Sequence, residues 1–264
     1  MIQTFFNFRH MPFSKNLKSS ELLDTPARLE ITARLDHLRK HKGLFLLTGA
    51  PGTGKTTSLR GWVDSLPKLS YRVVYIPLTT ISPYDLYHFI NLELSGEPAH
   101  RKSKLFVNLQ AAILDSCSVS RRLPVVIIDD AHCLPPKTLL ELPMLLNFKM
   151  DSFDPLIFIL SGHDRLSSRL RSPSLRHLDQ RITLRYEMPT LDEDDTRNYI
   201  DHRLRLAGAD QDLFQSAAIL ALHKVSRGVH RLIDRIATDA LTIAAAQNRR
   251  LVTDEDVYTA SKTI

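Results

Sequence analysis

The chain has 264 residues, of which 43% are hydrophobic and 24% are charged, a composition that argues against a disordered chain. No apolar run approaches the ~20 residues of a membrane helix, and the N-terminus lacks a leader-like apolar stretch, so we expect a cytoplasmic protein that does not enter a membrane. The net charge of +6 favours an anionic partner, and two cysteines, Cys117 and Cys133, argue against a disulfide framework.

The first 190 residues alternate between short apolar runs and helical patterns, after an aromatic segment that ends at Phe13. The expected helices cover residues 26–40, 55–66, 83–94, 104–116 and 139–150. The expected strands cover residues 44–47, 72–78, 123–128, 156–160 and 182–186. This alternation predicts an α/β fold in which a parallel five-stranded sheet is covered on both faces.

After Pro189 the pattern becomes entirely helical, without a strand-like segment. Helices are expected over residues 193–206, 211–225, 229–247 and 253–261. The sequence therefore predicts two domains: an α/β nucleotide-binding domain with the aromatic segment over residues 1–190, and a small all-α domain over residues 191–264.

The segment from Gly49 to Thr56 reads GAPGTGKT and fits the pattern of a phosphate-binding loop between a strand and a helix. Glycines let backbone N–H groups converge on phosphate, and the helix N-terminus favours an anion. Lys55 is expected to contact the β- and γ-phosphates, and the Thr56 hydroxyl to ligate Mg²⁺. The predicted nucleotide-binding residues of this loop are Gly49, Pro51, Gly52, Thr53, Gly54, Lys55, Thr56 and Thr57.

Asp129 and Asp130 follow an apolar strand, at the edge of the sheet where the phosphate loop also lies. Asp129 is expected to hold Mg²⁺ through water, and Asp130 to orient or deprotonate the attacking water. The alternative is that the two acids merely end a strand, and the intact loop upstream favours the metal and base roles. His132 and Cys133 suggest a metal site, but no second ligand pair has zinc spacing, so we reject it.

Four further residues are candidate contacts of the nucleotide. The strand over residues 156–160 is expected to lie between the strand that enters the phosphate loop and the strand that ends at Asp129. It ends near Ser161 and His163, and either side chain is a candidate to contact the γ-phosphate or the attacking water. A polar turn is the competing interpretation. Arg181 precedes the last strand and is expected to act on a neighbouring subunit's nucleotide. Arg231 is expected to sense the nucleotide from the helical domain, and a structural salt bridge is the alternative for both arginines.

In this order of parts the chain resembles an AAA+ ATPase, and more narrowly the ExeA-type family with its TniB- and TnsC-like transposon regulators. The resemblance extends over nearly the whole chain. The segments that carry it are 5–8, 12–13, 46–49, 127–132, 178–186, 199–208, 228–233 and 252–257. It implies ATP and Mg²⁺ as cofactors and a homo-oligomer in the form of a ring or filament. It also implies that Lys55 and Thr56 are the Walker A pair and Asp129 the Walker B aspartate. Arg181 would be the arginine finger and Arg231 the second sensor.

Two positions depart from the family pattern. Asp130 stands where most members have glutamate, which shortens the carboxylate by one methylene and implies slow, switch-like hydrolysis. His230 stands where a proline usually precedes the sensor arginine.

The function expected from the resemblance is that of a DNA-binding transposition regulator. ATP-loaded subunits would assemble on double-stranded DNA of largely any sequence, recruit a transposase and leave on hydrolysis. Because the chain ends after the helical domain, we expect no membrane or wall-binding segment and favour this branch. The alternatives are a secretion-pathway ATPase acting on proteins, a replication-initiator-like DNA binder and a nucleotide-locked scaffold without turnover. The expected DNA contacts are Arg101, Lys102, Lys104 and Thr79, and a solvated basic loop is the alternative.

Overall fold

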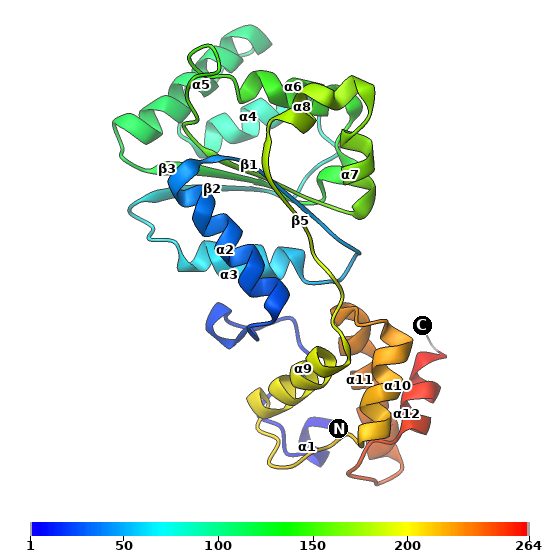
Figure 1. Ribbon diagram of the computed structural model, residues 1–264. Helices are drawn as coiled ribbons and strands as arrows, with labels where there is room; N and C mark the ends of the chain where they lie inside the picture. The colour runs from blue at the N-terminus through cyan, green and yellow to red at the C-terminus, as the bar shows by residue number, and fades with distance from the viewer. Residues whose placement is uncertain (1, 263–264) are drawn as a thin grey trace. The chain divides into compact units, whose positions relative to one another are not determined.

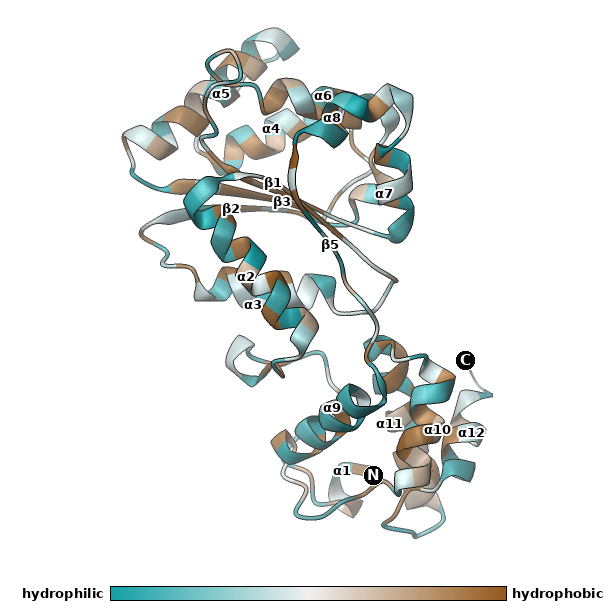
Figure 2. Cartoon of the chain, viewed as in Figure 1, coloured by the Kyte–Doolittle hydropathy of each residue, from teal (hydrophilic) through white to brown (hydrophobic). Residues whose placement is uncertain are grey.

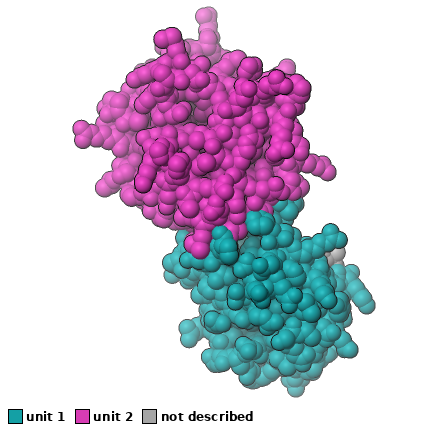
Figure 3. Space-filling view, viewed as in Figure 1, with its two compact units in different colours: residues 1–26, 50–54, 189–264 teal, residues 27–49, 55–188 magenta. Residues whose placement is uncertain are grey.

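The structure is a computed structural model that describes residues 2–262. It divides into two compact units, drawn in different colours in Figure 3. Unit 1 contains the chain up to Pro26, residues 50–54 and the chain from Pro189 onward, and unit 2 contains residues 27–49 and 55–188. Within residues 2–262, no helix combines the length and the apolar character that crossing a membrane requires.

Unit 2 is built on a parallel five-stranded sheet with the spatial order β2-β3-β4-β1-β5 (Figure 1). Its strands are β1 (Gly43–Thr48), β2 (Tyr71–Ile76), β3 (Leu123–Ile128), β4 (Ile157–Ser161) and β5 (Ile182–Glu187). The predicted α/β class is confirmed. The predicted position of β4 between β3 and β1 is confirmed as well, with Leu47 of β1 opposite Ser161 of β4.

The helices around the sheet form two layers. They are α2 (Pro26–His41), α3 (Lys55–Ser65), α4 (Pro83–Glu93), α5 (Lys102–Ser118), α6 (Pro136–Leu145), α7 (Asp164–Leu170) and α8 (Arg176–Gln180). Helices α2 and α3 cover one face and α4 to α8 cover the other (Figure 1).

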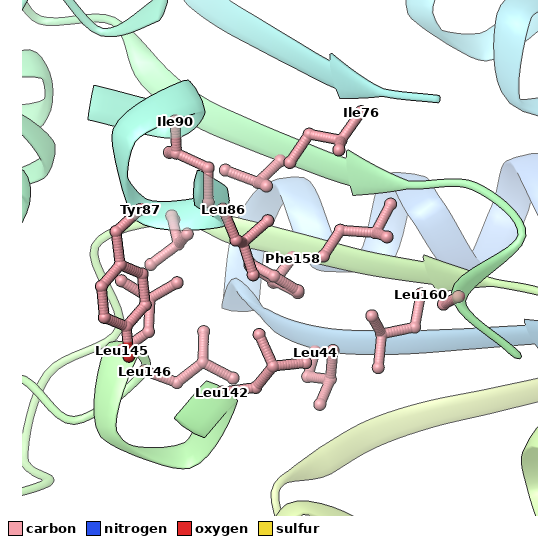
Figure 4. Packing of buried hydrophobic residues seen from close by; sticks show 14 of the residues in the cluster. Leu44, Ile76, Leu86, Tyr87, Ile90, Leu142, Leu145, Leu146, Phe158 and Leu160 are labelled. Atoms are coloured by element: carbon pink, nitrogen blue, oxygen red, sulfur yellow. The ribbon is translucent and has the colours of Figure 1, made fainter. Parts of the chain in front are cut away.

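Alternation along the strands explains these two layers, because successive strand side chains point to opposite faces. Leu44 and Leu46 of β1 join the core beneath α4 to α8, part of which Figure 4 shows. Phe45 and Leu47 join the core beneath α2 and α3. Since both faces are buried, the inner strands β1, β3 and β4 are almost continuously apolar, whereas the edge strands β2 and β5 carry polar residues; Figure 2 shows this contrast by colour.

Unit 1 is helical over its C-terminal part. Its helices are α1 (Ile2–Phe5), α9 (Glu193–Leu206), α10 (Ser216–Ser226), α11 (His230–Ala246) and α12 (Asp254–Ser261), with a 3₁₀ turn at Ser19–Glu21. Phe6, Phe8 and Phe13 of the N-terminal aromatic segment are buried in the core of these helices. The aromatic segment therefore packs with the C-terminal helices, whereas the sequence analysis assigned it to the α/β domain.

A buried arginine holds the N-terminal segment on α9. The side chain of Arg203 is 4% exposed, and its guanidinium donates to the carbonyl oxygens of Pro12 and Ser14 over 2.8 and 2.6 Å. It also donates to the hydroxyl of Tyr199 over 2.8 Å, and that hydroxyl donates to Asp234 of α11 over 2.7 Å. Such a chain of hydrogen bonds satisfies a charge that would otherwise be costly to bury.

Several element boundaries differ from the predicted ones. Helix α6 begins at Pro136, because proline suits the first helical turn, and ends at Leu145 rather than residue 150. Helix α10 starts at Ser216 rather than residue 211, since Phe214 forms a β-bridge with Val252. Helices α7 and α8 were not predicted, because they are only seven and five residues long and bury two leucines and one leucine, too few for a helical period to show in the sequence.

Candidate nucleotide-binding site

The phosphate loop connects β1 to α3, as its pattern predicts. Gly52 and Gly54 have φ values of +84° and +100°, in the left-handed region that glycine occupies without strain. Lys55 is 8% exposed and its ammonium donates to the carbonyl oxygen of Gly49 over 2.8 Å. The lysine charge is therefore held at the start of α3, where backbone N–H groups also favour an anion.

The Asp129 carboxylate is the centre of a hydrogen-bond cluster in unit 2. It is 6% exposed and lies at the carboxyl end of β3. Its Oδ2 atom accepts from the Thr56 hydroxyl over 2.6 Å and from the Tyr75 hydroxyl over 3.1 Å. Its Oδ1 atom accepts from the backbone N–H of Asp130 over 3.1 Å. The structure thus brings together Thr56 and Asp129, the two residues expected to hold Mg²⁺.

Tyr75 was missed as a site residue in the sequence analysis. Burial, and then the neighbouring Asp129 carboxylate, raise the pKa of Tyr75 to about 12, so its hydroxyl stays a donor at neutral pH. The register of β2 on β3, rather than the local sequence, carries the signal for this contact. Tyr75 pairs with Ile127, and Ile127 and Asp129 lie two residues apart, which is the spacing of side chains on one face of a strand.

Asp130 follows in a left-handed conformation with φ +48°. This turn leaves its side chain 69% exposed, unlike that of Asp129. The Nδ1 atom of His132 lies 3.9 Å from the Asp130 carboxylate. The two acids therefore have separate environments: Asp129 is buried and accepts three hydrogen bonds, whereas Asp130 is open to water. This is the division that a metal-holding acid and a water-activating acid require.

The end of β4 supplies two polar side chains near these acids. Ser161 is fully buried, and its hydroxyl has no hydrogen-bond partner among the described residues. The backbone N–H of His163 donates to Nδ1 of His132 over 3.4 Å, and the two imidazole rings lie 5.7 Å apart. The Nδ1 atom of His163 is likewise buried without a partner in the described part of the chain. Both predicted candidates thus retain hydrogen-bonding capacity.

Arg181 lies away from this group of residues. It immediately precedes β5, at the amino end of the parallel sheet, whereas Asp129 follows the carboxyl end of β3. Its guanidinium pairs with Asp151 over 2.5 Å. Asp151 belongs to a run of three left-handed residues, Lys149 to Asp151, with φ values of 48°, 54° and 65°. Arg181 therefore does not reach Asp129 of its own chain.

Within unit 1, residues 50–54 pack with the start of α11. The Thr53 side chain is fully buried and its hydroxyl donates to the Ala50 carbonyl over 2.9 Å. The backbone N–H of Arg231 donates to the carbonyl of Gly52 over 3.2 Å. The structure thus places the predicted sensor arginine against the phosphate loop. Pro51 and Thr57 are exposed.

The four residues expected to contact DNA differ in exposure and in ion pairing. Arg101 and Lys104 are exposed at the start of α5. Lys102 is ion-paired with Glu141 of α6 and lies 6.0 Å from the ring of Tyr87. Thr79 is only 6% exposed, so its side chain is buried and is not a surface contact, contrary to the expectation from the sequence.

Comparisons with known proteins agree with this geometry. The family described as AAA domain matches residues 38–170, from the end of α2 to the end of α7. The chain belongs to the AAA domain family. The matched residues include the phosphate loop, the acid at the end of β3 and the polar residues at the end of β4.

A curated relative is General secretion pathway protein A of Aeromonas hydrophila, which is 33% identical over 99% of this chain. This likeness supports the predicted ExeA-type relationship, while closeness to TniB- and TnsC-like regulators stays a prediction. The chain spans 48% of the length of that relative.

Solved structures with the same fold include Cdc6p from Pyrobaculum aerophilum, with a TM-score of 0.73 and 20% identity over 96% of this chain and 70% of that one. The ORC1 protein of Aeropyrum pernix in complex with DNA has a TM-score of 0.69 and 15% identity over 97% of this chain and 69% of that one. At these identities the likeness establishes an AAA+ P-loop fold.

Proposed function

We propose that this protein is a Mg²⁺-dependent ATPase that works as a slow switch. The observation that carries the proposal is the cluster of Thr56, Asp129 and Lys55 at the carboxyl edge of the sheet. There the buried Asp129 carboxylate accepts a hydrogen bond from the Thr56 hydroxyl over 2.6 Å, and Lys55 stands beside Thr56 at the start of α3.

The residues fit Mg²⁺ and a nucleoside triphosphate. A hydroxyl has one proton and two lone pairs, so Thr56 can donate to Asp129 and still offer oxygen to a metal ion. Ser161 adds a buried hydroxyl without a partner among residues 2–262, which suits a phosphate oxygen or a water. When bound, Mg²⁺ would neutralise charge on the phosphates. Lys55 would bind phosphate, and Asp130 would accept a proton from water.

Assembly into a ring or filament is part of the proposal. Arg181 lies at the amino edge of its own sheet, so it would meet the phosphates of a neighbouring copy. Arg231, bonded through its backbone to Gly52, would respond to the nucleotide in its own loop. Both assignments follow the resemblance to AAA+ ATPases and are consistent with the positions of the two arginines.

We further propose that the assembly forms on double-stranded DNA, in the cytoplasm, and presents it to a transposase. The net charge of +6 favours largely sequence-independent phosphate contacts, for which Arg101 and Lys104 are the exposed candidates and Lys102 is a paired one. The DNA-bound ORC1 neighbour lends support at the level of the fold.

A second candidate has its own support. The 33% identity to General secretion pathway protein A favours an ATPase of a secretion pathway that acts on protein partners. The two candidates share the nucleotide site and differ in what the ATP-bound form binds, so DNA dependence separates them.

The deciding experiment images the purified protein with random-sequence duplex by negative-stain microscopy, in ATP, ADP or a slowly hydrolysed analogue. Rings or filaments on DNA only with ATP or the analogue are expected, and Lys55→Ala is expected to abolish both nucleotide binding and assembly. An active ATPase that ignores DNA under every nucleotide would favour the secretion candidate. A protein that binds no nucleotide would overturn both.

A further inference from the structure

The Asp129 carboxylate has almost no freedom left in its hydrogen bonding. An ionised carboxylate offers about four lone-pair positions. Three are used: Thr56 and Tyr75 donate to Oδ2, and the Asp130 N–H donates to Oδ1. About one position therefore remains for a water on a metal ion, and its direction is set by the other three donors.

Two of these three donors are inherent to the phosphate-loop arrangement. Thr56 comes from the loop, and the Asp130 N–H comes from the turn that follows β3. The third comes from a different element, β2, which is hydrogen-bonded to β3 along its whole length, from Tyr71 opposite Leu123 to Ile76 opposite Ile128. The parallel register places Tyr75 beside Ile127, on the same strand face as Asp129.

We propose that Tyr75 is a positioning residue for the magnesium-binding carboxylate of this ATPase. Its hydroxyl fixes the rotation of the Asp129 carboxylate, so that the open lone pair points where a metal-bound water must be. Outer hydrogen bonds of this kind commonly change metal affinity when they are removed. This inference rests on the proposed function, because it assigns a role within the same site.

Tyr75 is suited to this role by its partial burial. Its side chain is 43% exposed, so removing the hydroxyl leaves no enclosed cavity and the variant is expected to fold. Tyr71, on the same strand, provides a matched control. The Tyr71 hydroxyl accepts from Arg39 of α2 over 3.0 Å and takes no part in the Asp129 cluster.

The test measures binding of a fluorescent ATP analogue by anisotropy, first in excess EDTA and then across a Mg²⁺ titration. In EDTA, Tyr75→Phe is expected to bind the nucleotide like the wild type. In the titration, Tyr75→Phe is expected to need on the order of tenfold more Mg²⁺ to reach half of the full increase in nucleotide affinity. Tyr71→Phe is expected to follow the wild-type curve.

A double-mutant cycle separates positioning from a general structural effect. In Asp129→Asn, which removes the charge of the acceptor, adding Tyr75→Phe is expected to change the Mg²⁺ dependence no further. The inference is overturned if Tyr75→Phe matches the wild type at every Mg²⁺ concentration, or if it loses affinity equally in EDTA. A wild-type protein that binds no nucleotide would instead refute the proposed function, so the two failures are distinguishable.

Discussion

The backbone N–H of Arg231 donates a hydrogen bond to the carbonyl of Gly52, with 3.2 Å between nitrogen and oxygen. The first turn of α11 is therefore bonded directly to the phosphate loop within unit 1. Gly52 has φ +84°, and a Cβ atom on it would lie 2.8 Å from Cβ of Arg231 and 3.1 Å from Cγ1 of Val229. Only a glycine permits this close approach of loop and helix.

Gly52→Ala is accordingly expected to weaken nucleotide binding. The added methyl must displace α11 or the loop, and a non-glycine residue at this φ costs on the order of 1–3 kcal/mol. If that cost falls on the nucleotide-bound state, nucleotide affinity decreases by about fivefold to 150-fold. Fluorescent-nucleotide titration measures the affinity, and thermal unfolding tests whether the folded state bears the cost instead. Unchanged affinity together with unchanged unfolding would mean that the loop tolerates a side chain here.

Asp130→Asn is expected to trap the ATP-bound assembly on DNA. The amide is isosteric with the carboxylate but cannot accept a proton from water at neutral pH. The substitution leaves the Asp129 cluster intact, because residue 130 contributes only its backbone N–H to that cluster. Binding of nucleotide should therefore persist while phosphate release is lost. Rapid quench of ATP turnover and the lifetime of the protein on DNA are the two measurements. Normal hydrolysis in this variant would show that the base is another group.

Arg181→Ala is expected to reduce ATP hydrolysis on the order of a thousandfold without changing nucleotide affinity, because a finger arginine acts on charge that develops during phosphoryl transfer. Mixing this variant with Asp130→Asn should restore part of the activity, since Asp130→Asn subunits still bind ATP and assemble, and therefore supply intact Arg181 to a neighbour's site. A defect that mixing cannot relieve would place Arg181 in a role within its own chain.

Asp151→Asn is the matched variant for the same arginine. The Asp151 side chain is 58% exposed, so its ion pair with Arg181 contributes about 0–1 kcal/mol. Hydrolysis by Asp151→Asn is therefore expected to stay within about fivefold of the wild type. A loss as large as that of Arg181→Ala would show that the ion pair itself orients the finger.

Sequence reasoning succeeded where a pattern repeats or a motif is contiguous. Apolar runs located all five strands, and the segment from Gly49 to Thr56 located the loop between β1 and α3. It was less successful where tertiary contacts decide. Phe6, Phe8 and Phe13 carry no mark of the helices that bury them, because burial depends on surfaces nearly 200 residues away in the chain.

The same distinction applies within the candidate site. Lys55, Thr56 and Asp129 are marked by their own neighbours in the sequence, and the structure brings Thr56 within 2.6 Å of Asp129. Tyr75 is marked only by the register of β2 on β3, which no local pattern specifies. The ion pair of Arg181 with Asp151 likewise depends on a left-handed run at residues without glycine, where local preference predicts helix.

His230 introduces a pH dependence into the stability of the helical unit. Burial, and secondarily the positive charge of Arg203, lower the pKa of His230 from 6.5 to about 4 in the folded protein. Between these two values the unfolded chain binds a proton that the folded chain does not bind, so stability increases with pH in this window. The stability associated with neutral His230 is fully present above pH 6.5. As the pH falls toward 4, the free energy of unfolding decreases on this account by an amount on the order of 3 kcal/mol.

His230→Phe is expected to remove this dependence. The Nδ1 atom of His230 is buried without a partner among the described residues, and its ring packs edge-on against Tyr199 at 5.0 Å, a contact that phenylalanine can keep. The measurement is the free energy of unfolding by urea at several pH values between 4 and 7, in both proteins. Because Asp234, whose pKa burial raises, also titrates in acid, the informative quantity is the difference between the two curves. That difference should widen in favour of His230→Phe as the pH falls. Parallel curves would mean that His230 becomes protonated equally well in the folded chain, which would require water or a carboxylate to reach its ring.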